Sequence, residues 1–305
     1  MGTQPLDCLV IGAGPAGLTA AIYLARFHLT VAVVDAGKSR AAMIPRTHNH
    51  AGYPGGIAGT ELLALMARQA GKFGVAAERA AIESLTLGST GFLASAGDAT
   101  WTARTVLLAT GVVNHRPPMP PGLHDEALQR GLLRYCPVCD GYEVTDKRIG
   151  VIGTGERGFG EALFLRAYSA DVTLIAPADA HVLTAEQRDQ ARELGIALSA
   201  GPVLPLSLRG DRIVVQAGGA ELEFETVYPA LGSDIRSELA LRLGAKANDE
   251  GCLAVDAHQR TSIAGLYAAG DVTRGLDQIS HAMGEAAVAA TAIRNDLAEL
   301  RPQLR

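Results

Sequence analysis

The sequence predicts an α/β protein with two Rossmann-like, three-layer units, and two observations lead to this prediction. Short apolar strands alternate with helical segments through most of the 305 residues, as in a parallel sheet covered by helices. A glycine-rich G-x-G-x-x-G turn between a strand and a helix occurs twice, at residues 12–17 and 153–158. This repeat indicates two mononucleotide-binding units in one chain.

The first unit begins with a strand over residues 7–11, which is short and apolar as expected for a buried parallel strand. The glycine-rich turn follows, and then a helix from about Leu18 to Phe27. Residues 31–35 form the next strand, which ends in an acid about 20 positions after the glycine-rich turn. Strand, turn, helix, strand and acid thus stand in the order of a dinucleotide site.

Each conspicuous residue of the first turn has a physical task. Gly12 allows the tight bend, Gly14 lets the backbone approach a pyrophosphate, and Gly17 lets the helix pack closely on the strand. The helix N-terminus favours phosphate charge, and Asp35 can accept hydrogen bonds from ribose hydroxyls. The pattern therefore predicts a bound dinucleotide rather than a glycine-rich turn without a ligand.

The rest of the first unit runs from a long loop to a tight turn. Residues 39–60 are rich in glycine and proline, and a loop of this length in a compact domain tends to be functional. A helix over 61–73, which Thr60 could cap, and strands within 80–108 follow. The last strand is apolar and leads into a tight turn at 109–111.

The second unit begins after a proline-rich crossover at residues 114–122. Its first strand, 149–152, leads into the second glycine-rich turn, but its second strand ends at Ala176-Pro177-Ala178. No acid for a ribose hydroxyl stands at that strand end, and no arginine for a 2′-phosphate follows it. Near residues 232–250 the chain is expected to return to the first unit.

The chain closes with a strand and a long helix. Residues 266–271 form an apolar strand that ends in Gly270 and Asp271. A strand-end acid fits a cofactor hydroxyl, although an Asp turn or a helix cap gives the same pattern. The alanine-rich helix from about Gln278 to Leu300 has small residues suited to close packing against another helix, the first turn or a partner subunit.

One redox pair stands between the two glycine-rich turns. Cys136 and Cys139, two residues apart, can close a small disulfide and reopen it, and Asp140 follows at once. Cys8 within an apolar strand and the isolated Cys252 are expected to be inert. A single C-x-x-C makes a four-ligand zinc site unfavourable, so no metal is predicted.

Composition excludes several classes of partner. The net charge is −5 with both signs interspersed, which leaves no basic footprint for nucleic acid. No apolar run approaches the roughly 18 residues of a membrane span. The N-terminus lacks a basic region followed by an apolar one, so no secretory signal is expected and the predicted compartment is the cytoplasm.

Five motifs in order resemble the low-molecular-weight thioredoxin reductase family of flavoproteins over nearly the whole chain. They are Gly12–Gly17, Asn49-His50-Ala51-Gly52, Ala109-Thr110-Gly111, Cys136–Gly141, and Gly270-Asp271 with Gln278 a few residues later. The resemblance implies the glutathione-reductase type of fold, with an FAD-binding domain formed by residues 1–114 and 246–305. The insert, residues 115–245, would be NAD(P)H-domain-like and carry the cysteines. It also implies a homodimer and a thioredoxin-like protein or small dithiol or disulfide as substrate.

The resemblance assigns roles position by position. Cys139 would face the flavin, Cys136 would attack the substrate disulfide, and Asp140 would supply or accept the proton that thiol exchange requires. The positions expected to bind FAD are Gly12, Gly14, Pro15, Ala16, Gly17, Asp35, Asn49, Ala109, Thr110, Gly111, Gly270, Asp271, Gln278 and Ile279. A second dinucleotide site would be formed at Gly153, Gly155 and Gly158.

Departures from the family affect the electron donor. The family places a His-Arg-Arg run where this chain has Ala176-Pro177-Ala178, and Arg188 and Arg192 on a helix are a poor substitute. The chain also has Gly158 for a usual alanine, Ala51 for a proline, and Asp277 for the arginine beside Gln278. The use of NAD(P)H therefore stays open, and a second FAD in the second site is an alternative.

The resemblance and its departures together imply an FAD-dependent thiol–disulfide oxidoreductase that does not use NADPH in the usual way. Three alternatives remain: a dithiol oxidase using oxygen, a disulfide reductase linked to ferredoxin or a second flavin, and a non-catalytic flavin redox sensor. The segment from Cys136 to Glu143 also resembles dithiol oxidases of natural-product pathways, but these usually carry histidine where Asp140 stands. A rotation of the second domain would alternate the cysteines between flavin and substrate.

Overall fold

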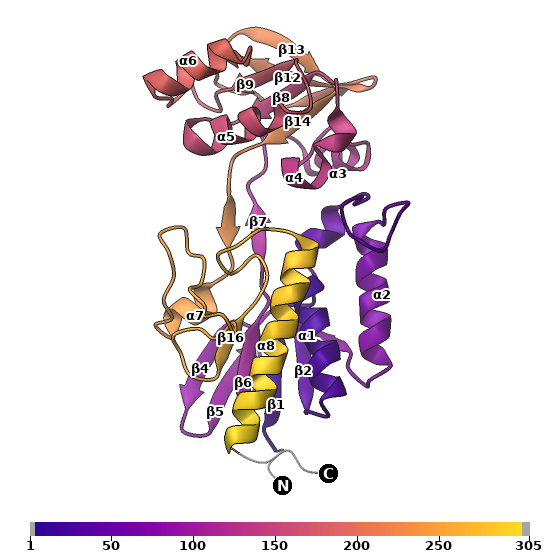
Figure 1. The fold of residues 1–305 in the computed structure, drawn as a ribbon, viewed down its shortest axis with the longest axis vertical. Helices are drawn as coiled ribbons and strands as arrows, with labels where there is room; N and C mark the ends of the chain where they lie inside the picture. Colours follow the sequence, from indigo (N-terminus) through magenta and orange to yellow (C-terminus); the bar gives the residue numbers. More distant parts are fainter. Residues whose placement is uncertain (1–3, 301–305) are drawn as a thin grey trace.

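A computed structural model describes residues 4–300. Figure 1 shows two lobes stacked along the long axis, with the middle of the chain in the upper lobe. The lower lobe contains both the first strand β1 and the last helix α8, and it corresponds to the first unit. Both lobes have a parallel sheet with helices against it, which confirms the predicted α/β class and the two Rossmann-like units.

The sheet of the lower lobe has seven strands. Its order is β3-β2-β1-β6-β5-β4, and β16 pairs with β6. Strand β1 is parallel to β2 and β6, while β4, β5 and β6 form an antiparallel meander. The strands are β1 (Leu6–Ile11), β2 (Val31–Asp35), β3 (Ala77–Arg79), β4 (Ser84–Gly88), β5 (Gly91–Ala96), β6 (Ala99–Leu108) and β16 (Leu266–Ala268).

Helices α1 and α8 pack side by side on one face of this sheet (Figure 1). Ala20 and Ala21 of α1 and Ala286 and Ala289 of α8 are fully buried, and their small side chains allow the close approach predicted for the C-terminal helix. A second core lies on the other face, where α7 packs. The helical elements are α1 (Pro15–Arg26), η1 (Arg40–Met43), α2 (Gly59–Gly71), α7 (Glu238–Arg242) and α8 (Ile279–Leu300).

Two helix starts differ from the prediction. Helix α1 begins at Pro15, before the expected Leu18, because proline is favoured in the first turn of a helix, where its missing N–H is not needed. The expected Thr60 cap is wrong, since α2 begins at Gly59 and its N-cap is Ala58. A Cβ at Gly59 would lie 1.8 Å from the carbonyl oxygen of Ala41, so glycine lets α2 start against the long loop.

The upper lobe contains a four-stranded parallel sheet, β10-β9-β8-β14, and an antiparallel sheet, β11-β12-β13. Gly218 and Gly219 form the tight turn between β12 and β13, both with positive φ, as predicted. The capping box of Thr184 and Gln187 is present at α6. The strands are β8 (Ile149–Ile152), β9 (Val172–Ile175), β10 (Ala197–Ser199), β11 (Ser207–Arg209), β12 (Arg212–Ala217), β13 (Ala220–Phe224) and β14 (Thr226–Pro229). The helices are α3 (Pro121–Gln129), α4 (Pro137–Asp140), η2 (Tyr142–Val144), α5 (Gly155–Leu165) and α6 (Ala185–Glu193).

A two-stranded ribbon connects the lobes. Strand β7 (Val112–Asn114) leaves the lower lobe and pairs antiparallel with β15 (Ser233–Ile235), which returns to it (Figure 1). Ala240 and Ala245, which follow β15, already belong to the core of the lower lobe. We therefore propose a domain boundary at the ribbon, earlier than the predicted limit between residues 245 and 246.

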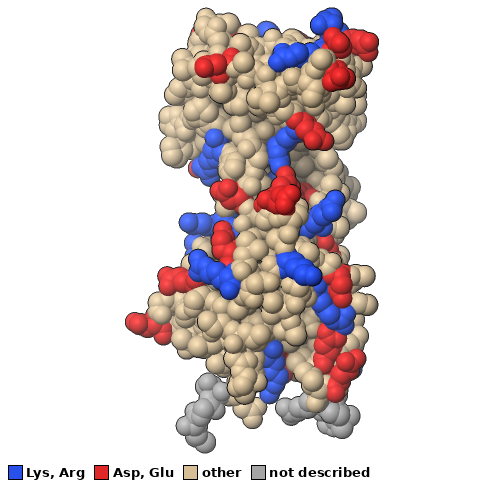
Figure 2. Space-filling model, turned by 90° about the vertical axis from the view of Figure 1, so that its left-hand side faces the viewer, with Lys and Arg blue, Asp and Glu red and all other residues tan. Residues whose placement is uncertain are grey.

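The surface carries charges of both signs. On the face shown in Figure 2, basic and acidic side chains are interspersed, and many of them gather at the narrowing between the lobes. Within residues 4–300, no helix is both long enough and apolar enough to cross a membrane.

Candidate active site

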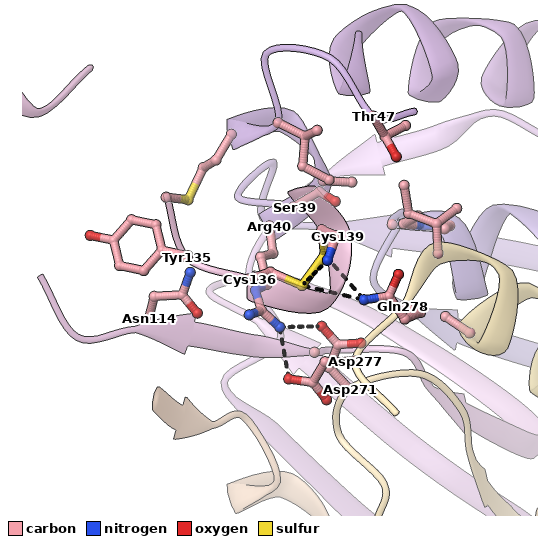
Figure 3. Close-up of a pocket in the computed structure, with 18 of the residues that line it drawn as sticks. Ser39, Arg40, Thr47, Asn114, Tyr135, Cys136, Cys139, Asp271, Asp277 and Gln278 are labelled. Atoms are coloured by element: carbon pink, nitrogen blue, oxygen red, sulfur yellow. Dashed lines mark hydrogen bonds and ion pairs between the residues drawn. A yellow bond between two sulfur atoms is a disulfide. The ribbon is translucent and has the colours of Figure 1, made fainter. Parts of the chain in front are cut away.

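A disulfide joins Cys136 and Cys139 where the lobes meet (Figure 3). Cys136 is the N-cap of the short helix α4, and the backbone N–H of Cys139 donates to its Sγ at 3.1 Å. Pro137 occupies the first helical position, where no N–H is needed. One turn of helix thus brings the two sulfur atoms together, as the C-x-x-C spacing predicted.

Two side-chain amides of the lower lobe contact the disulfide segment. Gln278 Nε2 lies 3.3 Å from Cys136 Sγ and 3.1 Å from Cys139 Sγ (Figure 3). Asn49 Nδ2 donates to Gln278 Oε1 at 2.9 Å and to the carbonyl oxygen of Val138 at 3.4 Å. The long loop and the start of α8 therefore hold the cysteine pair of the upper lobe against the lower lobe.

Asp140 is a mostly buried carboxyl group with two partners. Arg134 Nη1 lies 2.7 Å from its Oδ2, and the Tyr228 hydroxyl donates to its Oδ1 at 2.8 Å. Burial raises the pKa of Asp140 above its ordinary value, and Arg134 and Tyr228 oppose this rise only in part. A carboxyl group beside the cysteines that holds its proton more tightly than usual suits proton exchange with a thiolate.

Arg40 forms ion pairs with two carboxylates near the disulfide. Its Nη1 lies 3.0 Å from Asp271 Oδ2 and 2.7 Å from Asp277 Oδ2 (Figure 3). Burial, and next the charge of Asp277, raise the pKa of Asp271. Arg40 thus supplies, from the long loop, a guanidinium group beside the acid that stands before Gln278.

A cavity of about 340 Å³ opens beside the disulfide, between the lobes. Its lining extends from the N-terminus of α1 to the cysteines, and residues of the upper lobe close it. Fourteen of the predicted site residues line it: Gly14, Pro15, Ala16, Asn49, Ala109, Thr110, Gly111, Cys136, Cys139, Asp140, Gly270, Asp271, Gln278 and Ile279. The chain thus brings together residues that are far apart in the sequence.

The first glycine-rich turn supports this cavity from below. A Cβ at Gly12 would lie 2.3 Å from the carbonyl oxygen of Ala109, and one at Gly17 would lie 1.8 Å from that of Gly12, so both positions require glycine. Asp35 holds the turn, since its Oδ1 accepts the N–H of Ala13 at 2.9 Å. These three predicted residues do not line the cavity but shape it.

FAD fits this arrangement. The N-terminus of α1 points its free N–H groups toward the cavity, where a pyrophosphate can bind without a side chain at Gly14. Asp35 can accept further hydrogen bonds from a ribose, because each carboxylate oxygen has two lone pairs. Gln278 lies at the far end, next to the sulfur atoms, and Asp271 also lines the cavity.

The chain has relatives along nearly its whole length. Residues 6–286 match the family model of pyridine nucleotide-disulphide oxidoreductases. The chain belongs to this family. Thioredoxin reductase of Mycolicibacterium smegmatis is 32% identical over 277 residues, covering 87% of this chain and 88% of the relative. That of Bacillus subtilis is 30% identical over 318 residues, covering 98% and 97%. The crystal structure of thioredoxin reductase from Streptococcus pyogenes superposes with a TM-score of 0.88 at 27% identity, covering 98% of this chain and 100% of that one.

Membership confirms the resemblance seen in the motifs. The protein is a thioredoxin reductase-like flavoprotein, a flavin-dependent disulfide oxidoreductase with Cys136–Cys139 as its disulfide. FAD is the cofactor implied by the family and by the fit of the first cavity.

The second glycine-rich turn of this family member is covered by its own chain. The N–H of Val182 donates to Thr154 Oγ1 at 2.7 Å, and a Cβ at Gly155 would lie 3.7 Å from the Val182 carbonyl oxygen. His181 beside it has buried ring nitrogens without hydrogen-bond partners among the described residues, and burial lowers its pKa. The segment that follows β9 thus crosses the turn where a pyrophosphate would approach.

Cations for a 2′-phosphate are absent from the end of β9. Ala176 is fully buried, and the carbonyl oxygens of Ala176 and Ala178 pack against Gly201. Arg188 donates to the carbonyl oxygen of His181 at 2.9 Å, and Arg192 pairs with Asp189 at 2.7 Å. The residues at this edge therefore do not fit the 2′-phosphate of NADPH.

The glycines of the second turn pack on each other. A Cβ at Gly158 would lie 2.6 Å from the Gly153 carbonyl carbon.

Three site residues were not found from the sequence. Arg40, Arg134 and Tyr228 reach the site through contacts with Asp271 and Asp140, and no motif marks these three positions. Tyr228 lies in the apolar strand β14, where a tyrosine is expected to be a core residue.

Proposed function

We propose that the protein catalyses thiol–disulfide exchange at Cys136–Cys139, and that the electrons pass between this pair and FAD in the first cavity. When bound there, FAD supplies two-electron redox chemistry beside the sulfur atoms. The observation that carries the proposal is the position of the disulfide: both sulfur atoms contact Gln278, and Cys139 lines the cavity that fits the flavin.

The residues around the pair have separate tasks in this proposal. Gln278 and Asn49 orient the disulfide toward the first cavity. Asp140 holds a proton for Cys139, since thiolate formation and protonation must alternate during exchange. Arg134 and Tyr228 position the Asp140 carboxyl group.

The electron donor in this proposal is an external dithiol rather than NADPH. The support is the second turn, which Val182 covers and which has no cation at Ala176 or Ala178. If dithiols proved to be products rather than donors, ferredoxin would supply the electrons in place of NADPH. A second FAD bound at Gly153, Gly155 and Gly158 would be the other possible source in that case. With a dithiol as donor, oxygen would accept the two electrons from the reduced flavin, and the enzyme would then run as a dithiol oxidase.

The proposed partners follow from the family and from size. Thioredoxin is the protein substrate that the relatives' names suggest. Because Cys136 lies at the contact between the lobes, such a protein would reach it only after the second domain rotated about the β7–β15 ribbon. A homodimer and a cytoplasmic location stay predictions.

An anaerobic titration of the FAD-loaded protein tests the proposal. The flavin absorbance is followed during additions of NADPH, then NADH, then dithiothreitol. We expect no reduction by either nucleotide and full reduction by the dithiol. Fast bleaching by NADPH would restore the ordinary thioredoxin reductase assignment.

Cys136→Ser is the matched variant for this titration. It removes the sulfur that reacts with the substrate but no residue that supports the first glycine-rich turn. We expect bound FAD at the wild-type level and no reduction by dithiols. Reduction by dithiol in this variant would contradict the assignment, and admission of oxygen to the reduced wild-type protein, with peroxide detection, identifies an oxidase.

A further inference from the structure

A second cavity, of about 310 Å³, adjoins the first and also has Cys136 in its wall. Cys136 lines both cavities, whereas Cys139 lines only the first of the two. The walls of the second cavity come from helix α5, the end of β14, the β7–β15 ribbon and residues 276–278. Cys136 therefore adjoins a cavity that Cys139 does not line, with the lobes as they stand.

The rim of this second cavity is apolar. Val138, Phe164 and Leu276 line it and are 47%, 40% and 53% exposed. Charged side chains, Arg40 and Arg157 among them, also line the cavity. Apolar walls with a small number of placed polar groups are typical of a small-molecule pocket. The volume lies at the small end of such pockets and cannot admit a folded protein.

One carboxyl group in this cavity has an unused oxygen. Glu161 Oε2 is shielded from solvent and has no hydrogen-bond partner among the described residues. Burial raises the pKa of Glu161 to about 7, although Arg157 and Arg40 lower it, and Asp277 is the other ionisable acid in the wall. A carboxyl group that titrates near neutrality can both take and return a proton.

We propose that the second cavity binds a small, predominantly apolar dithiol or disulfide, and that Glu161 holds the proton exchanged with the substrate thiol that reacts at Cys136. This inference rests on the proposed function, since it needs Cys136–Cys139 to be the redox pair. It names a substrate class that reacts without rotation of the second domain.

The exchange balances without a further reactant. One substrate thiol gives its proton to Glu161, its sulfur bonds to Cys136 Sγ, and the Cys136–Cys139 bond breaks with Cys139 leaving as thiolate. The second substrate thiol then attacks the first substrate sulfur, and Cys136 leaves as thiolate. Glu161 returns its proton to Cys136, and the second substrate proton ends on Cys139. Two electrons and two protons have moved from the dithiol to the cysteine pair.

The test compares a small dithiol with a protein dithiol. Reduction of the FAD-loaded protein is followed anaerobically by stopped flow, with dihydrolipoamide as an uncharged, largely apolar dithiol and with reduced thioredoxin. For dihydrolipoamide, we expect a wild-type rate that rises through an inflection near pH 7. In Glu161→Gln this inflection disappears and the rate falls about tenfold or more, while the thioredoxin rate changes less than about twofold.

Two further variants separate chemistry from binding. Glu156→Gln removes an exposed acid of the same helix that does not line the cavity, and we expect no change. Leu276→Asp places a charge at the apolar rim and should raise KM for dihydrolipoamide about tenfold with kcat nearly unchanged.

The outcomes separate a failure of this inference from a failure of the proposed function. An unchanged pH profile in Glu161→Gln overturns the role of Glu161, and an unchanged KM in Leu276→Asp overturns the pocket. Reduction by thioredoxin but not by dihydrolipoamide overturns the substrate class while the redox pair stands. Reduction by dihydrolipoamide in Cys136→Ser would instead contradict the proposed function itself.

Discussion

The two glycine-rich turns of this chain have the same spacing but different surroundings. At the first, the N-terminus of α1 opens on a cavity and Asp35 stands at the end of β2. At the second, Val182 contacts the turn and Ala176 follows the end of β9. The same spacing of glycines thus occurs with different residues after the second strand, where a dinucleotide site has its charge partners.

The two N-cap positions test this comparison directly. Gly14 caps α1 and Thr154 caps α5, and both have extended backbone that accepts a side chain. Gly14→Asp would place a carboxylate beside the FAD pyrophosphate and should weaken FAD binding at least roughly tenfold by like-charge repulsion. Thr154→Asp should leave the flavin content unchanged, as measured by absorbance after gel filtration. Equal loss in both variants would break the comparison.

A buried carboxyl group in each lobe allows a second comparison, of stability against pH. Glu161 of α5 has an unpartnered oxygen, and its pKa is raised from 4.5 to about 7. Because the folded state disfavours its ionisation, stability is lost as pH rises from the unfolded pKa through the folded one. Glu161→Gln should therefore raise the free energy of unfolding by on the order of 3 kcal/mol at pH 8 and by little at pH 4.

Glu285 of α8 is the matched control for this stability measurement. It accepts the N–H of Gly270 at 2.7 Å and lies 3.0 Å from His281 Nε2. Glu285→Gln should destabilise the protein, because a buried donor loses a charged acceptor. Urea unfolding at the two pH values measures both variants, and stabilisation of neither would show that burial does not strain Glu161.

Asp140 tests the chemistry that joins the lobes. Asp140→Asn keeps the shape of the side chain but cannot hold an exchangeable proton. Exchange with dithiols should slow about 100-fold, while FAD stays bound because the Asp140 carboxyl group contacts Arg134 and Tyr228 rather than the first glycine-rich turn. Stopped-flow reduction measures the rate. A rate within threefold of wild type would assign proton transfer elsewhere.

The smallest effect is expected from cations added to the second unit. A double variant with Pro177→Arg and Ala178→Arg supplies charge near the end of β9, but Val182 still covers the turn. Reduction by NADPH and by NADH should remain slow and differ by less than about threefold. A strong preference for NADPH in this variant would show that the missing cations, and not Val182, had prevented NADPH from binding.

The fold was predictable from local patterns, whereas part of the site was not. Alternating strands and helices with two repeated turns specify the layers, because each pattern is carried by neighbouring residues. The redox pair was equally visible, since its spacing fits one helical turn. Arg40 with Asp271, and Tyr228 with Asp140, are separated by long stretches of chain, so only the folded structure joins them.

The packing of Gly158 against Gly153 has a consequence for how such sequences are interpreted. A larger residue at Gly158 would push helix α5 away from strand β8, whatever binds nearby. Close packing therefore accounts for Gly158 whether or not a nucleotide binds nearby. The motif alone is not evidence that the second unit holds one.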